Sequence, residues 1–282
     1  MLQQRVLTAL ALLAVLLPAL LYPSFVPFAL VVLLLMAAAA WEWGRLNGCA
    51  MWPSLGLGAS CVLLCLLTWW LGWLQQRLQP LWLGAGLFWL LGVVLMLRAG
   101  VAGWPRIPAA VRLLAGVLAL WLAWLAAVQA RMVGINFLLS ALALVWVADI
   151  AAYAAGRTFG LRFTRQKLAP SISPGKTWEG VAGAVLGVLL LACGWVAADA
   201  AWQTPVVSLF SRLAQPGWWW LLPAVLFMVA MSVAGDLVES LIKRAAGAKD
   251  SSRLLPGHGG VLDRVDALLP TLPLAMLFSS WL

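Results

Sequence analysis

Apolar runs of about 20 residues alternate with short polar segments along almost all of the 282-residue chain. A helix of that length spans the hydrocarbon core of a bilayer. We therefore expect an all-α, polytopic membrane protein with about nine transmembrane helices. The nine apolar runs lie at residues 6–22, 25–41, 55–74, 81–97, 111–128, 134–155, 179–200, 218–242 and 263–281.

The basic residues are divided unevenly between the segments that connect these runs. If the N-terminus is cytoplasmic, all 18 Lys and Arg residues except Arg77, Arg131 and Arg212 lie at the cytoplasmic side. Such an asymmetry follows the positive-inside rule. It supports nine crossings and a cytoplasmic N-terminus.

Composition excludes several classes of protein. The chain is 65% hydrophobic and 10% charged, with a mean hydropathy of +1.00, which lies far outside the soluble range. The net charge of +9 could indicate nucleic acid binding, but the basic residues form no basic helix face and no aromatic platform. Membrane lipids and phosphorylated substrates are the expected partners, and nucleic acid is not.

The acidic residues are concentrated in the second half of the chain. Eight of the nine lie between Asp149 and Asp266, and only Glu42 precedes them. We expect one integrated membrane domain in which residues 1–133 form scaffold helices and residues 134–282 form the catalytic region.

One helix face of the eighth run carries polar side chains. Asp236, Glu239, Ser240 and Lys243 are spaced i, i+3, i+4 and i+7, so they share a face that climbs toward the cytoplasmic end. A stabilising ladder of ion pairs would explain the residues near the helix end. A carboxylate as deep as Asp236 more often marks a functional site.

Two further carboxylates, Asp263 and Asp266, open the last run one helical turn apart. Capping of a helix N-terminus would explain one of them. Together with Asp236 they make an oxygen-only set of the kind that suits Mg²⁺.

The segment before these carboxylates contains the only histidine, His258, within PGHGG. The amides of Gly259 and Gly260 could point at an anion, and His258 could either be catalytic or stabilise the turn by a hydrogen bond. Basic residues nearby are candidates for binding phosphate, although some must be topological anchors. They are Lys243, Arg244, Lys249, Arg253 and Arg264.

A second polar cluster spans residues 149–180. Asp149 and Tyr153 lie one turn apart, and Gly156 is expected to close their helix. A turn at Pro174 and Gly175 is expected to present Lys176 and Thr177 at the interface. The segment SPGKTWEG lacks the spacing of a P-loop and follows no strand, so a Walker motif is rejected. An ion pair with Arg157 or a lysine is the alternative role for Asp149.

Residues 240–266 match the signature S-x-x-K-R-x4-K-D-x5-P-x-H-G-G-x-x-D-R-x-D at every fixed position. The segments DxxAYxxGRxFG and LAPxISPGKTWEG extend the match upstream to residue 149. In these residues the chain resembles the phosphatidate cytidylyltransferases, also called CDP-diacylglycerol synthases. The resemblance implies the reaction of CTP with phosphatidate to give CDP-diacylglycerol and pyrophosphate. It also implies a Mg²⁺ centre, to which a monovalent cation such as K⁺ is added in the family, a homodimer, and a bacterial inner membrane with the active site facing the cytoplasm.

The predicted site residues fall into three groups. The catalytic residues are Asp236, Asp263, Lys243, Lys249 and His258. The substrate-binding residues are Asp149, Tyr153, Lys176, Thr177, Ser240, Arg244, Asp250, Gly259, Gly260 and Arg264. The metal ligands are Asp236, Asp263 and Asp266.

Two other functions fit parts of this pattern. A CTP-dependent kinase acting on a polyprenol or another lipid alcohol would need the same metal and nucleotide but would release CDP. A transporter or channel would place paired polar sites in two repeats, whereas the polar residues here crowd one half of the chain.

Overall fold

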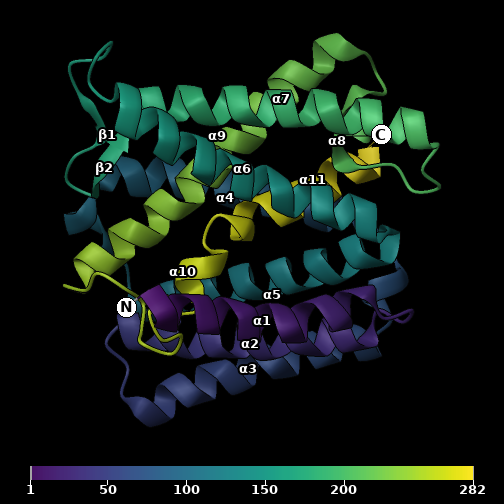
Figure 1. The fold of residues 1–282 in the computed structure, drawn as a ribbon. Coiled ribbons are helices and arrows are strands. Elements are labelled where there is room, and N and C mark those ends of the chain that lie inside the picture. Colours follow the sequence, from purple (N-terminus) through teal and green to yellow (C-terminus); the bar gives the residue numbers. More distant parts are fainter. Residues whose placement is uncertain (1, 282) are drawn as a thin grey trace.

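A computed structural model describes residues 2–281 and shows a bundle of long helices (Figure 1). The long helices are α1 (Leu2–Leu21), α2 (Val26–Leu46), α3 (Met51–Trp70), α4 (Gln79–Ala99), α5 (Ala109–Val133), α6 (Ile135–Phe159), α7 (Trp178–Trp202) and α9 (Trp218–Ala245). These eight are long and apolar enough to cross a membrane. The all-α polytopic fold is thereby confirmed.

Shorter elements complete the chain. They are the 3₁₀ helices η1 (Trp73–Gln75) and η2 (Val101–Arg106), the helices α8 (Leu209–Ala214), α10 (Leu262–Val265) and α11 (Leu268–Trp281), and the strands β1 (Lys167–Ala169) and β2 (Ser173–Thr177). The structure places β1 and β2 in a small antiparallel hairpin in which Lys167 pairs with Thr177.

Two groups of helices enclose a central one. Helices α1, α2, α3 and α5 pack together, as do α6, α7 and α9, and α11 contacts α4, α5 and α9 between them (Figure 1). Helix α5 is the most deeply embedded of the eight long helices, since two thirds of its apolar window is buried. Because α11 bridges both groups, residues 1–133 and 134–282 share one core.

The ninth predicted helix is divided. We expected one helix over residues 263–281, but α10 ends at Val265 and α11 begins at Leu268 and has only 14 residues. Helix α11 still runs through the bundle, so it ends at the side opposite the start of α1 (Figure 1). Asp263 therefore lies inside α10, and Asp266 lies in the break that follows it.

Two local predictions around residues 149–177 were wrong. Helix α6 does not close at Gly156 but continues to Phe159, with Gly160 as its C-cap. Pro174 and Gly175 lie in strand β2 rather than in a turn. The strand forms because its two ends pair with β1, Ser173 with Ala169 and Thr177 with Lys167, and the register is irregular between these pairs.

Candidate active site

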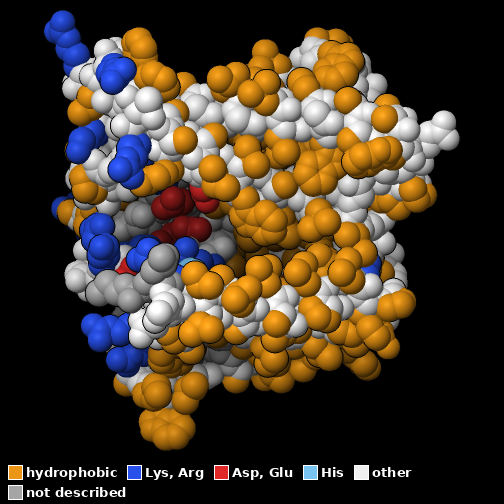
Figure 2. Space-filling model, viewed as in Figure 1, with side chains coloured by type: hydrophobic (Ala, Val, Ile, Leu, Met, Phe, Trp, Pro, Cys, Tyr) orange, Lys and Arg blue, Asp and Glu red, His pale blue; other side chains and the backbone are white. Residues whose placement is uncertain are grey.

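A polar cavity opens at the end of the bundle where Lys and Arg side chains gather, and carboxylates lie at the base of this hollow (Figure 2). The cavity has a volume of about 470 Å³ and lies between α6, β2, α7 and α9. Its polar lining comes from Asp149, Tyr153, Arg157, Lys176, Thr177 and Asp236. The structure thus brings the 149–180 cluster and the Asp236 face of α9 into one site.

Asp236 is held by two polar neighbours. Its Oδ2 pairs with Lys176 Nζ at 2.7 Å, and its Oδ1 accepts a hydrogen bond from Ser240 Oγ at 3.1 Å. Lys176 reaches it from β2, and Thr177 ends that strand by capping α7 with a hydrogen bond from Gly180 N to its Oγ1. The hairpin therefore aims a cation at the carboxylate of α9.

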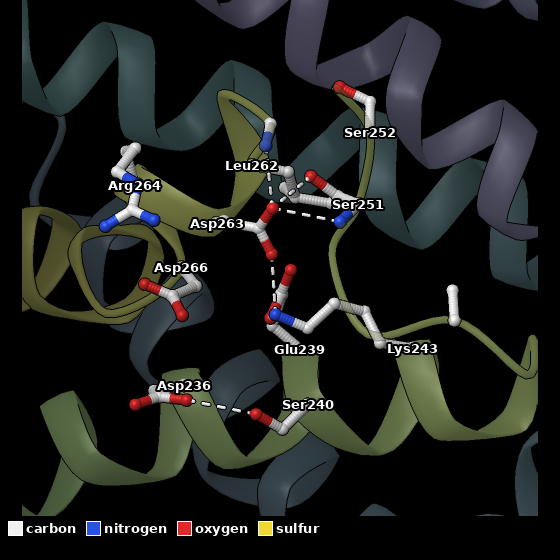
Figure 3. A network of polar contacts seen from close by, with 12 residues as sticks. Asp236, Glu239, Ser240, Lys243, Ser251, Ser252, Leu262, Asp263, Arg264 and Asp266 are labelled. Atoms are coloured by element: carbon white, nitrogen blue, oxygen red, sulfur yellow. Dashed lines mark hydrogen bonds and ion pairs between the residues drawn. The ribbon is translucent and has the colours of Figure 1, made fainter. Parts of the chain in front are cut away.

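Lys243 lies between two carboxylates farther along α9. Its Nζ bonds to Asp263 Oδ1 at 2.6 Å and pairs with Glu239 one turn back on the same helix (Figure 3). The side chains of Lys243 and Asp263 are 12% and 6% exposed, so the Lys243 ammonium group is largely buried and is occupied by its two ion pairs. The predicted polar face of α9 is confirmed by the pairs Asp236–Ser240 and Glu239–Lys243.

The carboxylate of Asp263 accepts hydrogen bonds on both oxygens. Oδ2 accepts from Ser251 N at 2.9 Å, from Ser251 Oγ at 2.9 Å and from Gly260 N at 2.8 Å. Burial alone would raise the pKa of this carboxyl, but the hydrogen bonds, led by those from Lys243 and Gly260, lower the pKa to about 2. Asp263 thus holds the loop between α9 and α10 against α9.

The two glycines after His258 fit this arrangement. Gly259 has φ +82°, and a Cβ there would lie 2.7 Å from Asp263 Oδ2. A Cβ on Gly260 would lie 2.0 Å from Ser251 Oγ and 2.5 Å from Glu42 Oε1. The amide of Gly260 does point at an anion, as expected, but that anion is the carboxylate of Asp263.

Glu42 belongs to this site although it comes from α2. Its carboxylate accepts hydrogen bonds from Ser251, Ser252, Val261 and Leu262 in the α9–α10 loop and at the start of α10. Sequence reasoning missed Glu42, Ser251 and Arg157. Glu42 could have been found from the sequence, because a lone carboxylate in an apolar helix often marks a functional site.

Several predicted phosphate ligands make contacts within the protein. Arg244 donates to Ile172 O, and Arg264 donates to His258 O. Lys249 and Asp250 are exposed on the loop. The predicted roles of these residues stay predictions, as does that of His258, whose buried Nδ1 has no hydrogen-bond partner within residues 2–281.

The donor set for a metal ion is partly assembled. Asp266 faces Asp236 across the gap between α9 and the α10–α11 break (Figure 3), and Asp149 lines the same cavity as Asp236. Two carboxylates that face one another suit a divalent cation of oxygen preference. Asp263 is engaged by Lys243, Ser251 and Gly260, and within residues 2–281 no three His, Cys, Asp or Glu side chains converge as metal ligands.

An apolar cavity of about 450 Å³ lies on another side of α9. Trp89, Trp104 and Arg112 contribute to its walls, and it reaches Gly235, Glu239 and Leu262 close to the polar site. The two cavities therefore adjoin the same turns of α9, one polar and one apolar.

Comparison with known proteins supports the resemblance over the full length. A model of the cytidylyltransferase family matches residues 3–282. The phosphatidate cytidylyltransferase of Pseudomonas aeruginosa is 37% identical over 281 residues, covering 97% of this chain and 95% of that protein. The enzyme of the same name from Haemophilus influenzae is 35% identical over 299 residues, covering 99% and 98%. This chain belongs to the cytidylyltransferase family.

Proposed function

We propose that this chain transfers the cytidylyl group of CTP to phosphatidate, giving CDP-diacylglycerol and pyrophosphate, at the polar end of the bundle. The observation that carries this assignment is the similarity to phosphatidate cytidylyltransferases over nearly the whole chain, and the pair of cavities beside α9 supports it. The polar one suits the phosphates of a nucleotide and of a lipid headgroup. The apolar one has room for part of an acyl chain next to the same helix turns.

The reaction needs two anions to meet. An oxygen of the phosphatidate phosphate attacks the α-phosphorus of CTP in line, and the bond to the β-phosphate breaks so that pyrophosphate leaves with its electron pair. Catalysis of this kind depends on positioning and on neutralising charge. No covalent enzyme intermediate is required.

The cations of the polar cavity supply part of that neutralisation. Lys176 and Arg157 line it and would bind phosphate oxygens, with Lys249 and Arg253 available on the exposed loop. Tyr153 accepts a hydrogen bond from Arg157 at 2.9 Å, which orients the guanidinium. Lys243 is bound to Glu239 and Asp263 and instead keeps α9 and α10 together.

Asp236 and Asp266 are the residues that would hold Mg²⁺, with Asp263 as the third predicted ligand and a monovalent cation such as K⁺ as the second ion. The ion, when bound, would neutralise charge on the reacting phosphates. The facing carboxylates of these two residues, one of which lines the polar cavity, support this part of the proposal (Figure 3).

The proposal includes an orientation and an assembly. The basic end of the bundle would face the cytoplasm from the inner membrane of a bacterium, which the positive-inside rule supports. Labelling of a cysteine placed at Lys249 by a membrane-impermeant reagent would test the side: reaction in inverted vesicles and not in intact cells is expected. A homodimer, as the resemblance implies, would be seen in the mass of the detergent-solubilised protein.

Position-specific labelling of CTP distinguishes the proposed reaction from its nearest alternative. With purified protein, phosphatidate and Mg²⁺, label at the α-phosphorus should enter the lipid and pyrophosphate should be released. A lipid kinase would transfer label from the γ-phosphorus to a lipid alcohol and release CDP. The second outcome would overturn the proposal.

A further inference from the structure

Glu42 is a fully buried carboxylate in the apolar helix α2, at 0% exposure. Oε1 accepts hydrogen bonds from Ser252 Oγ at 2.5 Å and from Val261 N at 3.0 Å. Oε2 accepts from Leu262 N at 2.7 Å and from Ser251 Oγ at 3.2 Å. Four donors therefore converge on one side chain, and each oxygen takes one backbone amide and one hydroxyl.

The four donors come from the two ends of one loop. Ser251 and Ser252 follow the exposed segment after α9, whereas Val261 and Leu262 open α10. Glu42 thus closes a loop to which it is linked only through space, since more than 200 residues separate it from each donor. Two neighbouring contacts in α1 add to this closure, because Arg5 donates to Gly257 O and Thr8 donates to Pro256 O.

One donor connects Glu42 to the site. The single hydroxyl hydrogen of Ser251 is shared between two acceptors, since its Oγ lies 3.2 Å from Glu42 Oε2 and 2.9 Å from Asp263 Oδ2. Asp263 Oδ1 in turn bonds to Lys243 at 2.6 Å. Figure 3 shows Ser251 beside Asp263, which in turn faces Lys243 on α9. A shift of the loop at Ser251 would move the Asp263 carboxylate and the α9 side chains bonded to it.

Burying the carboxylate of Glu42 costs free energy, and its hydrogen-bond donors are arranged for a carboxylate and no other side chain. Burying an ionised group away from water carries a penalty of several kcal/mol unless hydrogen bonds compensate it, and no Lys or Arg within residues 2–281 pairs with Glu42. All four partners donate, so a glutamine could not replace it: its amide NH₂ would face another N–H. Only a carboxylate accepts from both backbone amides at once and still offers lone pairs to Ser252 and to the hydroxyl hydrogen that Ser251 shares with Asp263.

We propose that Glu42 is a positioning residue for cytidylyl transfer, which sets the loop geometry that places Asp263 and Lys243. None of the four hydrogen-bond partners of Glu42 lines the polar cavity, so Glu42 acts through Ser251 and the start of α10. The effect on kcat rests on the proposed function. The effect on the loop, measured by proteolysis, does not depend on that function.

The test compares Glu42→Gln with Asp199→Asn in full-length, detergent-solubilised protein. Asp199 is a matched control: it is also a buried carboxylate with four donors, from Asn136, Thr204, Ser208 and Ser211, near the opposite end of α7 from the site. Three quantities are measured: kcat and KM for CTP, the rate of tryptic cleavage after the exposed Arg253, and the thermal unfolding midpoint.

Glu42→Gln is expected to lower kcat about 10- to 100-fold while KM for CTP changes by less than about 3-fold. Cleavage at Arg253 should accelerate about 10-fold because the loop opens locally. Asp199→Asn should lower the unfolding midpoint and leave kcat and Arg253 cleavage unchanged. If Glu42→Gln does not fold, Ser252→Ala removes one of the four donors and should lower kcat by about 3- to 10-fold.

Three results would overturn the inference. The first is wild-type kcat in folded Glu42→Gln or, where that variant does not fold, in Ser252→Ala. The second is a raised KM with unchanged kcat, which would make Glu42 a binding residue. The third is an equal loss of kcat in Asp199→Asn, which would make the effect one of general stability. If the wild-type protein forms no labelled lipid, the proposed function fails, and Arg253 cleavage still decides whether Glu42 closes the loop.

Discussion

A single added methyl group at Gly260 should disrupt the loop that joins α9 to α10. A Cβ at this position would lie 2.0 Å from Ser251 Oγ, 2.5 Å from Glu42 Oε1 and 2.7 Å from Glu42 Cδ, where real Cβ contacts do not occur. Overpacking of this kind costs about 1–3 kcal/mol. If Ser251 moves away, its hydrogen bond to the charged Asp263 is lost as well, which adds about 1.5–3 kcal/mol.

The expected result for Gly260→Ala is therefore a free energy of unfolding lower by about 2.5–6 kcal/mol. For a chain of this size that corresponds to a fall in the unfolding midpoint of roughly 5–15 °C. Thermal unfolding of the detergent-solubilised protein, followed by intrinsic tryptophan fluorescence, would measure it.

Gly84→Ala is the matched control. Gly84 is exposed on α4, and a Cβ there would meet nothing within 4 Å. The same chemical change should therefore leave the midpoint unchanged or raise it slightly. A midpoint for Gly260→Ala equal to that of Gly84→Ala would refute the packing argument.

Three further predictions concern the basic end of the bundle. Asp236→Asn should lower turnover by at least about 100-fold in folded protein, because it removes the charge that would hold Mg²⁺ and that pairs with Lys176 at 2.7 Å. Near-normal turnover would contradict the proposed metal-binding role of Asp236. Glu179→Gln should accelerate tryptic cleavage at Arg165, since Glu179 Oε1 accepts from Phe163 N, Thr164 N and Thr164 Oγ1; unchanged cleavage would show that the segment is held otherwise. Removal of divalent cations by a chelator should abolish CDP-diacylglycerol formation and added Mg²⁺ should restore it, and persistent turnover in the chelator would exclude the metal proposal.

The membrane helices were predictable because a span must be apolar over its whole length. That constraint found every long helix of the bundle, including α5 and α6, with ends that differ by several residues. The β1–β2 hairpin was not predicted, because its strands have only three and five residues and lie in the polar segment that connects α6 to α7. The break at Asp266 and Ala267 was not predicted for a related reason: apolar residues continue from Ala267 onward and conceal the end of α10.

The site was predictable where its contacts are local. The pairs Asp236–Ser240 and Glu239–Lys243 follow from helical spacing alone. The pair Lys176–Asp236 joins segments 60 positions apart, so the sequence could nominate both residues without pairing them. The carboxylate of Glu42 was set aside with the scaffold, because no local pattern connects α2 to α10.

The PGHGG segment illustrates how one pattern allows two readings. Glycines beside a histidine were expected to aim amides at a substrate anion, and the substrate-binding role of Gly259 and Gly260 stays a prediction. In the structure the amide of Gly260 bonds to Asp263, and the next two amides bond to Glu42. Because these three backbone amides donate to carboxylates within the protein, they are not free to donate to substrate phosphates. Phosphate binding then falls to the side-chain cations around the polar cavity, and the glycines are required because both carboxylates approach the backbone too closely for a Cβ.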